Sequence, residues 1–259
     1  MNILNDIIAA KKIEVEQRRS VTSIKDLEKA PFFERKTFSL EAALAAGVGN
    51  GIIAEFKRRS PSKGIINDKS GVAEVTMAYT KYGASGLSVL TDKQFFGGSA
   101  EDLAAARINT IPILRKDFIV DEYQVVESKA MGADVILLIA ACLSPEEVKQ
   151  LAKAARQLQM DVLLEMHTED ELDHACESTN IIGINNRDLR TFEIDIERSI
   201  RLGERLPADK IRVAESGISK VETIRSLKQH DFRGFLVGEN FMKADDPGEA
   251  FREFAEQLG

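Results

Sequence analysis

"TIPILRKDFIVDEYQ", residues 110–124, contains both parts of a β/α unit. An apolar strand begins at Ile111, and the charged residues Arg115, Lys116 and Asp117 follow it before a new helix begins near Asp121. Burying a charge without a partner or water costs several kcal/mol. The charged end of this strand is therefore expected at a pocket that is open to water, where a ligand can also enter.

The sequence contains seven further apolar runs, and each of them also precedes a segment with helical periodicity. The predicted strands are 51–57, 86–92, 112–118, 134–140, 161–167, 181–186, 211–217 and 234–240. Repeated strand–helix units with strands that are apolar throughout predict a closed parallel barrel, an α/β fold of the (β/α)8 TIM-barrel class. The alternative is an open doubly wound sheet, but the first strand runs into KRRSPSKG (57–64), which lacks the glycine-rich fingerprint of that fold.

Residues 1–50 precede the first predicted strand and are expected to form an N-terminal helical extension of the barrel, which spans 51–259, within a single domain. In this extension, MNILNDIIAAKKIEVEQRR (1–19) has apolar residues at helical spacing and predicts an amphipathic helix. It lacks the basic start and the small-residue cleavage site of a signal peptide. Further along the chain, Ser144 and Thr168 are each predicted to cap the start of a helix.

The composition indicates a soluble, cytoplasmic protein that binds neither nucleic acid nor membrane. Hydrophobic residues make up 44% and charged residues 30%, with a net charge of -7. No apolar run approaches the roughly 20 residues of a membrane span. Cys142 and Cys176 predict no disulfide framework and fit a reducing compartment. The histidines are too scattered to predict a metal site, and they are His167, His174 and His230.

Polar side chains recur at the C-terminal ends of the predicted strands. Because side chains alternate along a strand, the polar end residue shares a face with apolar residues before it. We predict that these faces line the barrel axis and bring the polar groups to the C-terminal mouth, where barrel enzymes have their active sites. The residues expected there are Glu55, Lys57, Lys116, Glu165, Asn185 and Glu215. Arg115 and Asp117 alternate away from this face and are predicted to be structural.

Lysines and carboxylates in one pocket can exchange protons with a substrate. A carboxylate next to a lysine favours the charged form of both groups, so one site can hold an ammonium that donates a proton and a carboxylate that accepts one. Lys116 is the predicted donor. Glu165 is preferred as the acceptor over His167, because a histidine just past a strand is more often a loop or packing residue.

Two glycines indicate where a phosphate group binds. Gly217 follows the seventh predicted strand and Gly238 the eighth, where barrel enzymes bind phosphate through backbone amides. The KRRSPSKG loop, which contains Ser60, is either a lid over an anionic substrate or an exposed solubilising loop. Phe95 and Phe96 follow the second strand and either face a flat apolar ligand or pack on the barrel rim.

Blocks of sequence at all eight predicted strands together resemble the indole-3-glycerol phosphate synthase family of tryptophan biosynthesis. The blocks are IIAEFKRRSPSKG, LSVLTDKQFFGGS, PILRKDFIVDEYQ, DVILLIA, LLEMH, GINNRDL, VAESGI and LVGENFM. RKDFIVDEYQ and INNRDL are specific, whereas ESGI is shared more loosely with other phosphate-binding barrels. The resemblance covers nearly the whole chain.

The resemblance implies a carbon-carbon lyase (carboxy-lyase) without cofactor or metal. It would convert 1-(2-carboxyphenylamino)-1-deoxyribulose 5-phosphate to indole-3-glycerol phosphate, with loss of CO2 and water. Lys116 would be the general acid, Lys57 would hold the anionic substrate and assist proton transfer, and Glu165 would act in the dehydration. Orienting roles are implied for Glu55, Asn185, Arg187, Glu215 and Ser216. Substrate contacts are implied for Ser60, for Phe96 and Phe118 in an apolar wall, and for Gly217, Gly238 and Glu239 at the phosphate.

Three other functions compete with this prediction. A sugar-phosphate isomerase such as phosphoribosylanthranilate isomerase uses a cysteine, but neither Cys142 nor Cys176 ends a strand in the right place. A Schiff-base aldolase would use Lys116 as a nucleophile, and a non-catalytic ligand-binding barrel would need none of these acid–base residues. The expected partner is a small phosphorylated molecule; docking onto other tryptophan-pathway enzymes stays open.

Overall fold

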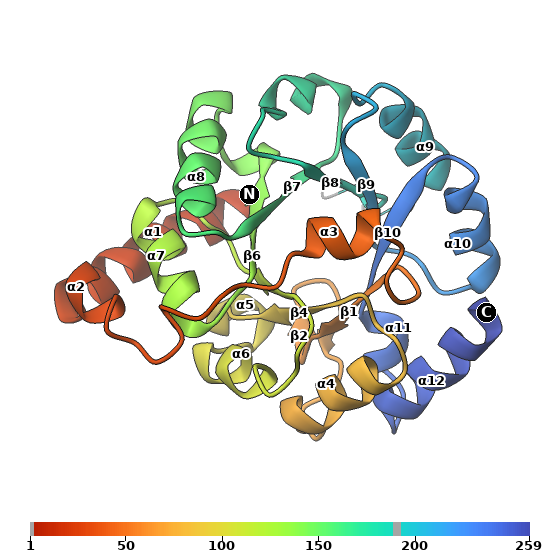
Figure 1. Cartoon of the computed structure of the whole chain (residues 1–259), viewed down its shortest axis with the longest axis horizontal. Coiled ribbons are helices and arrows are strands. Elements are labelled where there is room, and N and C mark those ends of the chain that lie inside the picture. The colour runs from red at the N-terminus through yellow and green to blue at the C-terminus, as the bar shows by residue number, and fades with distance from the viewer. Residues whose placement is uncertain (1–2, 189–192) are drawn as a thin grey trace.

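The computed structural model describes residues 3–188 and 193–259, in which parallel strands close into a barrel with helices around it (Figure 1). The barrel strands are β1 (Ile52–Phe56), β4 (Gly86–Leu90), β5 (Ile113–Lys116), β6 (Val135–Ile139), β7 (Asp161–Met166), β8 (Ile181–Asn185), β9 (Ile211–Glu215) and β10 (Phe232–Val237). The barrel closes where Ile52 of β1 pairs with Phe235 of β10. The structure confirms the predicted (β/α)8 fold and excludes the open doubly wound sheet.

The inner faces of the strands are apolar toward the N-terminal end and polar toward the C-terminal end. The apolar part is an inner core that contains Ile53, Leu114, Val135, Leu137, Leu163, Ile181, Val213 and Leu236. Two residues after Ile53 and Leu114 on the same faces come Glu55 and Lys116. The alternation of side chains therefore places the apolar residues in the middle of the barrel and the charged residues at its mouth.

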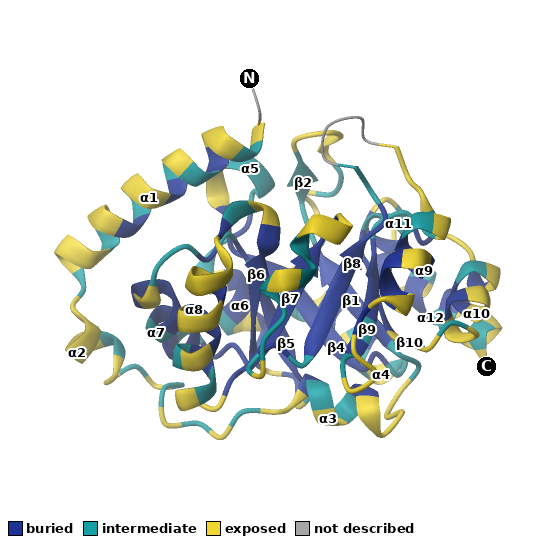
Figure 2. Ribbon diagram, turned by 90° about the horizontal axis from the view of Figure 1, so that it is seen from above, coloured by how far each residue is buried: buried dark blue, intermediate teal, exposed yellow. Residues whose placement is uncertain are grey.

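Three helices precede β1: two lie at opposite ends of the barrel, and the short one between them packs beside a helix of the outer ring (Figure 2). They are α1 (Ile3–Val21), α2 (Ile24–Leu27) and α3 (Leu40–Ala45). α3 closes the N-terminal end because its Leu40 and Leu44 belong to the inner core. α1 is the predicted amphipathic helix, and it lies at the opposite end, where Ile3, Leu4 and Ile7 line a cavity.

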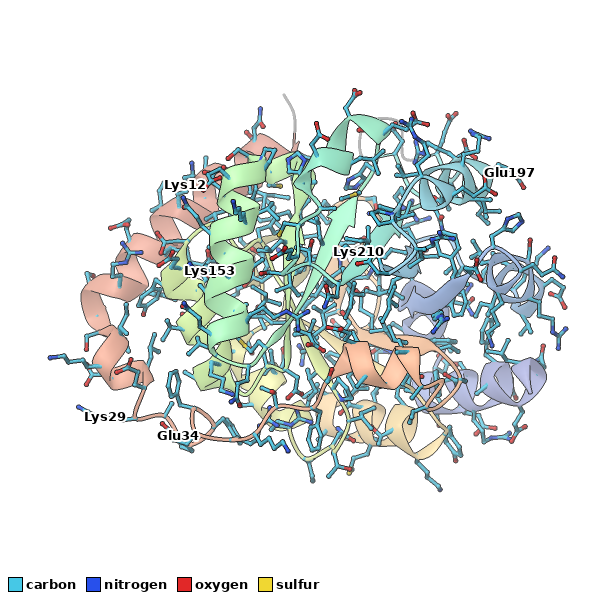
Figure 3. All side chains as sticks on the ribbon, turned by 45° about the horizontal axis from the view of Figure 1, so that its top comes forward. Lys12, Lys29, Glu34, Lys153, Glu197 and Lys210 are labelled. Carbon is cyan, nitrogen blue, oxygen red and sulfur yellow. The ribbon has the colours of Figure 1, made fainter. Side chains whose placement is uncertain are left out.

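The remaining helices mostly surround the barrel. They are α4 (Val72–Lys81), α5 (Lys93–Phe96), α6 (Ala100–Ala106), α7 (Glu122–Met131), α8 (Pro145–Gln157), α9 (Ile196–Glu204), α10 (Val221–Lys228), α11 (Glu239–Met242) and α12 (Pro247–Leu258), with the 3-10 helix η1 (Ala140–Cys142). Their outer faces carry exposed charges such as Lys153 and Glu197 (Figure 3). No helix within the two described ranges has the length and apolar composition needed to cross a membrane.

Local signals set where several helices begin. Ser144 forms a capping box with Glu147 at the start of α8, which confirms the predicted cap. Thr168 also caps a helix, but that helix is the short 3-10 helix η2 (Glu169–His174) and not the predicted α-helix. The prediction of an α-helix at this place was therefore wrong in type, although the helix start was right.

Candidate active site

A cavity of about 400 Å³ opens at the C-terminal ends of the barrel strands. Every residue that the sequence predicted for the site contributes to its lining. These residues are Glu55, Lys57, Ser60, Phe96, Lys116, Phe118, Glu165, Asn185, Arg187, Glu215, Ser216, Gly217, Gly238 and Glu239. The structure thus brings together side chains from strands and loops that are far apart in the sequence.

Lys116, at the end of β5, is held between two carboxylates. Its Nζ lies 2.8 Å from Glu165 Oε2 and 3.2 Å from Glu215 Oε2. Burial alone would lower the pKa of Lys116, but the neighbouring carboxylates, Glu165 first among them, outweigh burial and hold this pKa above its ordinary value. Lys116 is therefore an ammonium group at neutral pH and can donate a proton to a substrate oxygen.

Glu165, on β7, is an ionised carboxylate. Burial opposes its ionisation, but Lys116 and His167 outweigh burial and lower the pKa of Glu165 well below its ordinary value. Asn185 Nδ2 donates a hydrogen bond to Glu165 Oε1 over 3.0 Å, and His167 Nε2 lies 3.3 Å from the same oxygen. Glu165 lines the cavity, and His167 is a buried neighbour that holds it.

Glu215, on β9, has the opposite tendency. Burial, helped by the charge of Glu165, raises the pKa of Glu215 to about 7 against the attraction of Lys116. Gly183 of β8 provides the space for this side chain, because a Cβ at Gly183 would lie 2.0 Å from Glu215 Oε1. Two carboxylates whose pKa values are shifted in opposite directions beside one ammonium are typical of sites that perform acid–base chemistry.

Glu55 and Lys57 form a second ion pair at the end of β1. Lys57 Nζ lies 2.8 Å from Glu55 Oε1, and Ser88 Oγ donates a hydrogen bond to Glu55 Oε2 over 3.4 Å. Gly238, after β10, packs directly on Glu55, since a Cβ at Gly238 would lie 2.7 Å from Glu55 Oε1. The predicted phosphate-binding turn and the Glu55–Lys57 pair therefore contact each other.

The turn after β9 has a left-handed backbone at two successive residues. Ser216 has a φ of 66° and Gly217 a φ of 71°. This conformation costs a residue with a side chain about 1–2 kcal/mol, and such strain is concentrated at functional sites. Asn186 Nδ2 donates a hydrogen bond to the Ser216 carbonyl over 2.7 Å and holds the turn against the cavity.

Cations gather at the same end of the cavity. Arg187 Nη2 lies 3.8 Å and Lys63 Nζ 4.0 Å from the carboxylate of Glu239, so they offset its charge. Lys63 belongs to the KRRSPSKG loop, which folds back on itself through the antiparallel strands β2 (Arg59–Ser60) and β3 (Gly64–Ile65). Lys243 also lines the cavity and was not predicted, because it follows the short helix α11 and not a strand end.

The other side of the cavity is apolar. The ring centroids of Phe96 and Phe118 are 6.1 Å apart, and we call these two residues the aromatic wall. Of Phe95 and Phe96, it is Phe96 that lines the cavity. α1 adds the apolar residues Ile3, Leu4 and Ile7, which were predicted as a helix face and not as site residues. Their helical spacing reveals an apolar face but not the surface that this face covers.

Of the two residues beside Lys116, Arg115 has the predicted structural position, whereas Asp117 is structural but also lines the cavity. Arg115 is fully buried, and its Nη2 lies 3.0 Å from Asp117 Oδ2 and 2.9 Å from Glu127 Oε2 on α7. Asp117 also reaches the edge of the cavity lining. Arg115 and Asp117 therefore anchor the strand end from which Lys116 projects.

Cys142 lies near Glu165 but is not among the residues that line the cavity. Burial, helped by Glu165, raises the pKa of Cys142 to about 12, so its thiol stays protonated and is a poor nucleophile. Both cysteines are free. Across residues 3–188 and 193–259, no group of three or more His, Cys, Asp or Glu side chains is arranged to hold a metal ion.

Comparison with known proteins points to one family. The family model described as indole-3-glycerol phosphate synthase matches residues 4–254. The indole-3-glycerol phosphate synthase of Bacteroides thetaiotaomicron is 46% identical over 258 residues, which cover 99% of each chain. That of Polaromonas naphthalenivorans is 45% identical over 258 residues, which cover 97% of this chain and 98% of the relative.

Solved structures share the barrel at low sequence identity. A mutant tryptophan synthase alpha-subunit from Pyrococcus furiosus aligns with a TM-score of 0.61 and 17% identity, over 82% of this chain and 98% of that chain. A 3-hexulose-6-phosphate synthase aligns with a TM-score of 0.63 and 16% identity, over 81% of this chain and 100% of that chain. These two likenesses show the fold alone. The full-length family match and the identity to its curated members show that the chain belongs to the indole-3-glycerol phosphate synthase family of tryptophan biosynthesis and is a carboxy-lyase.

Proposed function

We propose that the chain performs the ring closure of its family with Lys116 as the general acid. The substrate is 1-(2-carboxyphenylamino)-1-deoxyribulose 5-phosphate, and its aromatic carbon must attack a ketone. This attack requires a proton on the carbonyl oxygen and a firm hold on both ends of the substrate. The observation that carries the proposal is the ammonium of Lys116, 2.8 Å from Glu165 and facing the cavity.

The two halves of the cavity suit the two ends of this substrate. The backbone of Ser216, Gly217 and Gly238, together with Arg187, supports binding of the phosphate. Lys57 supports binding of the benzoate carboxylate, and Ser60 lies in the loop beside it. The aromatic wall supports the ring between them, in a folded shape that brings the two reacting carbons together.

The later steps use the remaining charged groups. When the new carbon–carbon bond forms, the carbonyl electrons move to oxygen, which takes its proton from Lys116. Cleavage of the bond to the carboxylate then releases CO2. The electron pair of that bond returns to the six-membered ring, whose aromaticity is restored. Dehydration then expels the protonated hydroxyl as water and removes a proton from the adjacent carbon, which forms the aromatic indole ring. The ionised Glu165 is suited to accept the proton from carbon, and Lys57 to protonate the departing hydroxyl.

The other polar residues act on these groups and not on the bonds themselves. Asn185 orients Glu165 through its hydrogen bond of 3.0 Å. Glu215 shares Lys116 with Glu165, and Glu55 holds Lys57. Glu239 is offset by Arg187 and Lys63, so its backbone and not its charge is the part suited to a phosphate. This division agrees with the opposite pKa shifts of Glu165 and Glu215.

We also propose that residues 1–50 are an extension of the barrel of residues 51–259 and not a separate domain. Leu40 and Leu44 complete the inner core at one end of the barrel, and Ile7 lines the cavity at the other. An extension that supplies both a core plug and part of a ligand site has no core of its own. A chain without these residues should therefore lose both stability and substrate affinity.

We also propose that the protein is located in the cytoplasm. The two cysteines are free thiols, which suits a reducing compartment. The net charge of -7 gives no general attraction to nucleic acid, while the cations around the cavity provide local attraction for a phosphorylated small molecule. Association with other tryptophan-pathway enzymes stays a prediction, which sedimentation of mixed purified enzymes would test.

The proposed reaction is tested by mixing the purified protein with the carboxyphenylamino deoxyribulose phosphate. Ultraviolet absorbance or fluorescence of an indole product is expected to rise, with release of one CO2 per indole. A folded protein that gives no indole signal would overturn the proposal. Borohydride treatment with substrate separates the aldolase alternative, because a stable adduct on Lys116 would show that this amine is a nucleophile and not an acid.

A further inference from the structure

One buried lysine joins helix α1 to the barrel. Lys11 is 1% exposed, and it lies one helical turn after Ile7 on the buried face of α1. Ile7 lines the cavity, so Lys11 anchors the part of α1 that covers the site. Burying an ammonium group without partners is very unfavourable. The groups that contact the Lys11 ammonium therefore indicate its structural role.

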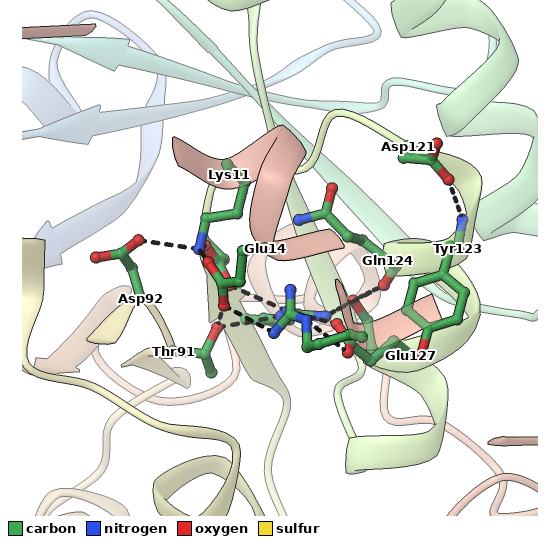
Figure 4. A network of polar contacts seen from close by, with 12 residues as sticks. Lys11, Glu14, Thr91, Asp92, Asp121, Tyr123, Gln124 and Glu127 are labelled. Carbon is green, nitrogen blue, oxygen red and sulfur yellow. Dashed lines mark hydrogen bonds and ion pairs between the residues drawn. The ribbon is translucent and has the colours of Figure 1, made fainter. Parts of the chain in front are cut away.

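Three carboxylates surround the Lys11 ammonium (Figure 4). Its Nζ lies 2.7 Å from Glu14 Oε2 on the same helix, 2.9 Å from Asp92 Oδ2 and 3.0 Å from Asp117 Oδ1. Burial lowers the pKa of Lys11, but Asp117 and Asp92 outweigh burial and raise it, so the group stays charged. Asp92 follows β4 and Asp117 follows β5, so a single ammonium ties α1 to two neighbouring barrel strands.

Each of these two barrel carboxylates also holds the backbone beside a ring of the aromatic wall. Asp117 Oδ1, the oxygen that faces Lys11, accepts a hydrogen bond from the N–H of Phe118 over 2.8 Å. Asp92 Oδ1 accepts hydrogen bonds from the N–H groups of Phe95 over 2.7 Å and Phe96 over 3.3 Å. Asp92 therefore links Lys11 to the backbone of Phe96, and Asp117 links Lys11 to the backbone of Phe118.

The rest of the charge cluster fixes Asp117 more firmly than Asp92. Asp117 Oδ2 accepts a hydrogen bond from Thr91 Oγ1 over 2.7 Å, and Arg115 Nη2 lies 3.0 Å from it. The second carboxylate oxygen of Asp92, Oδ1, contacts backbone N–H groups of α5, which is a helix of a single turn. Loss of the Lys11 charge should therefore displace α1 and the Phe96 side of the wall more than the Phe118 side.

We propose that Lys11 is a positioning residue for the aromatic wall. By binding Asp92 and Asp117 together, it seats α1 over the cavity and sets Phe96 and Phe118 at the distance that the substrate ring requires. This inference rests on the proposed function, which places the aromatic ring of the substrate at this wall. Lys11 acts through the two carboxylates and touches no reacting atom.

Three variants test the role. Lys11→Met removes the charge and keeps the length of the side chain, and Lys11→Arg restores the charge. Lys12→Met is the matched control, because Lys12 is the next residue on the same helix and is exposed. Calorimetry measures the binding of two probes: indole-3-glycerol phosphate, which carries the ring, and glycerol 3-phosphate, which carries only the phosphate end.

For Lys11→Met we expect binding of indole-3-glycerol phosphate to weaken about tenfold, the size of a lost aromatic contact, while glycerol 3-phosphate binds as to the wild type. KM for the substrate should rise by a similar factor, with a smaller fall in kcat. Lys11→Arg should recover part of the lost affinity, and Lys12→Met should match the wild type. If Lys11→Met does not fold, Lys11→Gln is measured in the same way.

Two results would overturn the inference. Unchanged binding of indole-3-glycerol phosphate to Lys11→Met would show that the wall does not depend on Lys11. Equal weakening of both probes would assign Lys11 to general stability instead of the wall. Indole formation by the wild type is measured in parallel: its absence contradicts the proposed reaction, whereas a working wild type beside an unaffected Lys11→Met contradicts only this inference.

Discussion

Lys116 of β5 and Glu165 of β7 form an ion pair of 2.8 Å although they are 49 residues apart in the sequence. β6 lies between their strands in the barrel, so the two side chains meet on the inner face at the mouth. A proton donor and a proton acceptor are thereby within reach of one small molecule. Each member of this arrangement can be replaced separately, and each replacement should have a different effect on the reaction or on stability.

Replacing Lys116 by Met should abolish most of the turnover and leave substrate binding nearly intact. Removal of a general acid lowers kcat by about 10²- to 10⁴-fold. Substrate affinity should stay within about tenfold, because the lost interaction acts mainly in the transition state. Steady-state and equilibrium binding measurements check both values. Lys153→Met, at an exposed position on α8, is the control and should change neither. A Lys116→Met enzyme with near-normal kcat would place the acid elsewhere.

Glu165→Gln should separate decarboxylation from dehydration. The glutamine keeps the size of the side chain and loses its capacity to accept a proton, so the dehydration that forms the indole ring should slow by about 10²- to 10⁴-fold. In a single turnover we expect CO2 to appear before the indole signal.

His167→Asn is the companion variant, because His167 lies 3.3 Å from Glu165 and is the alternative base. It should keep kcat within about tenfold, since it removes only a neighbour of the base. If His167→Asn instead shows the delay between CO2 and indole and Glu165→Gln does not, the two roles have to be exchanged.

Glu215→Gln should stabilise the protein more at pH 8 than at pH 5. The pKa of Glu215 is about 7 in the folded chain against an ordinary 4.5, so folding favours its protonated form. Its stabilising contribution is fully present below pH 4.5 and is lost as the pH rises through about 7, by at most about 3 kcal/mol. Glutamine stays neutral at both pH values, so the variant does not lose stability in this way as the pH rises. Thermal unfolding at the two pH values measures the difference.

Glu165→Gln is the control of opposite sign for that experiment. The pKa of Glu165 is lowered in the folded chain, so its contribution is present above its ordinary pKa and is lost as the pH falls through its folded value. This variant should therefore be less stable than the wild type at pH 8. Parallel behaviour of the two variants would contradict the opposite shifts assigned to these carboxylates.

Gly183→Ala should damage catalysis through Glu215. Its Cβ would lie 2.0 Å from Glu215 Oε1, so the carboxylate must move and Lys116 loses a partner. Overpacking of this kind costs about 1–3 kcal/mol. Gly234→Ala is the matched control, because its Cβ would lie 2.7 Å from Val213 Cγ2 near the closed end of the barrel. Both variants should melt earlier, but only Gly183→Ala should lose kcat; equal kcat values would show that Glu215 has no part in turnover.

Much of the barrel was predictable because its strands follow a simple rule. Ile53 and Glu55, or Leu114 and Lys116, are two residues apart and so share a face. Once the strands are parallel and buried on both sides, the charged member of each pair has only the mouth in which to meet water. The convergence of the strand-end residues on one cavity needed no more information than this alternation.

Contacts and pKa shifts that involve residues far apart in the sequence could not be predicted from the alternation of side chains. The spacing of Ile7, Lys11 and Val15 marks the buried face of α1, but the carboxylates that accept Lys11 come from the ends of β4 and β5. The raised pKa of Glu215 depends on the burial of its side chain and on the nearby charge of Glu165, and both are set only by the folded barrel. The 3-10 form of η2 is not evident from its acidic, Thr-capped sequence, which suits an α-helix equally well.

The seam between β1 and β10 has a consequence for synthesis of the chain. β1 leaves the ribosome early, yet its partner β10 and the Gly238 turn that packs on Glu55 are made near the end of translation. Until then the growing polypeptide has an unpaired sheet edge, which is prone to stick to other chains. A chain that stops before β10 also lacks Gly238 and Glu239 of the cavity lining, so we expect it to be inactive and prone to aggregation until the last strand is made.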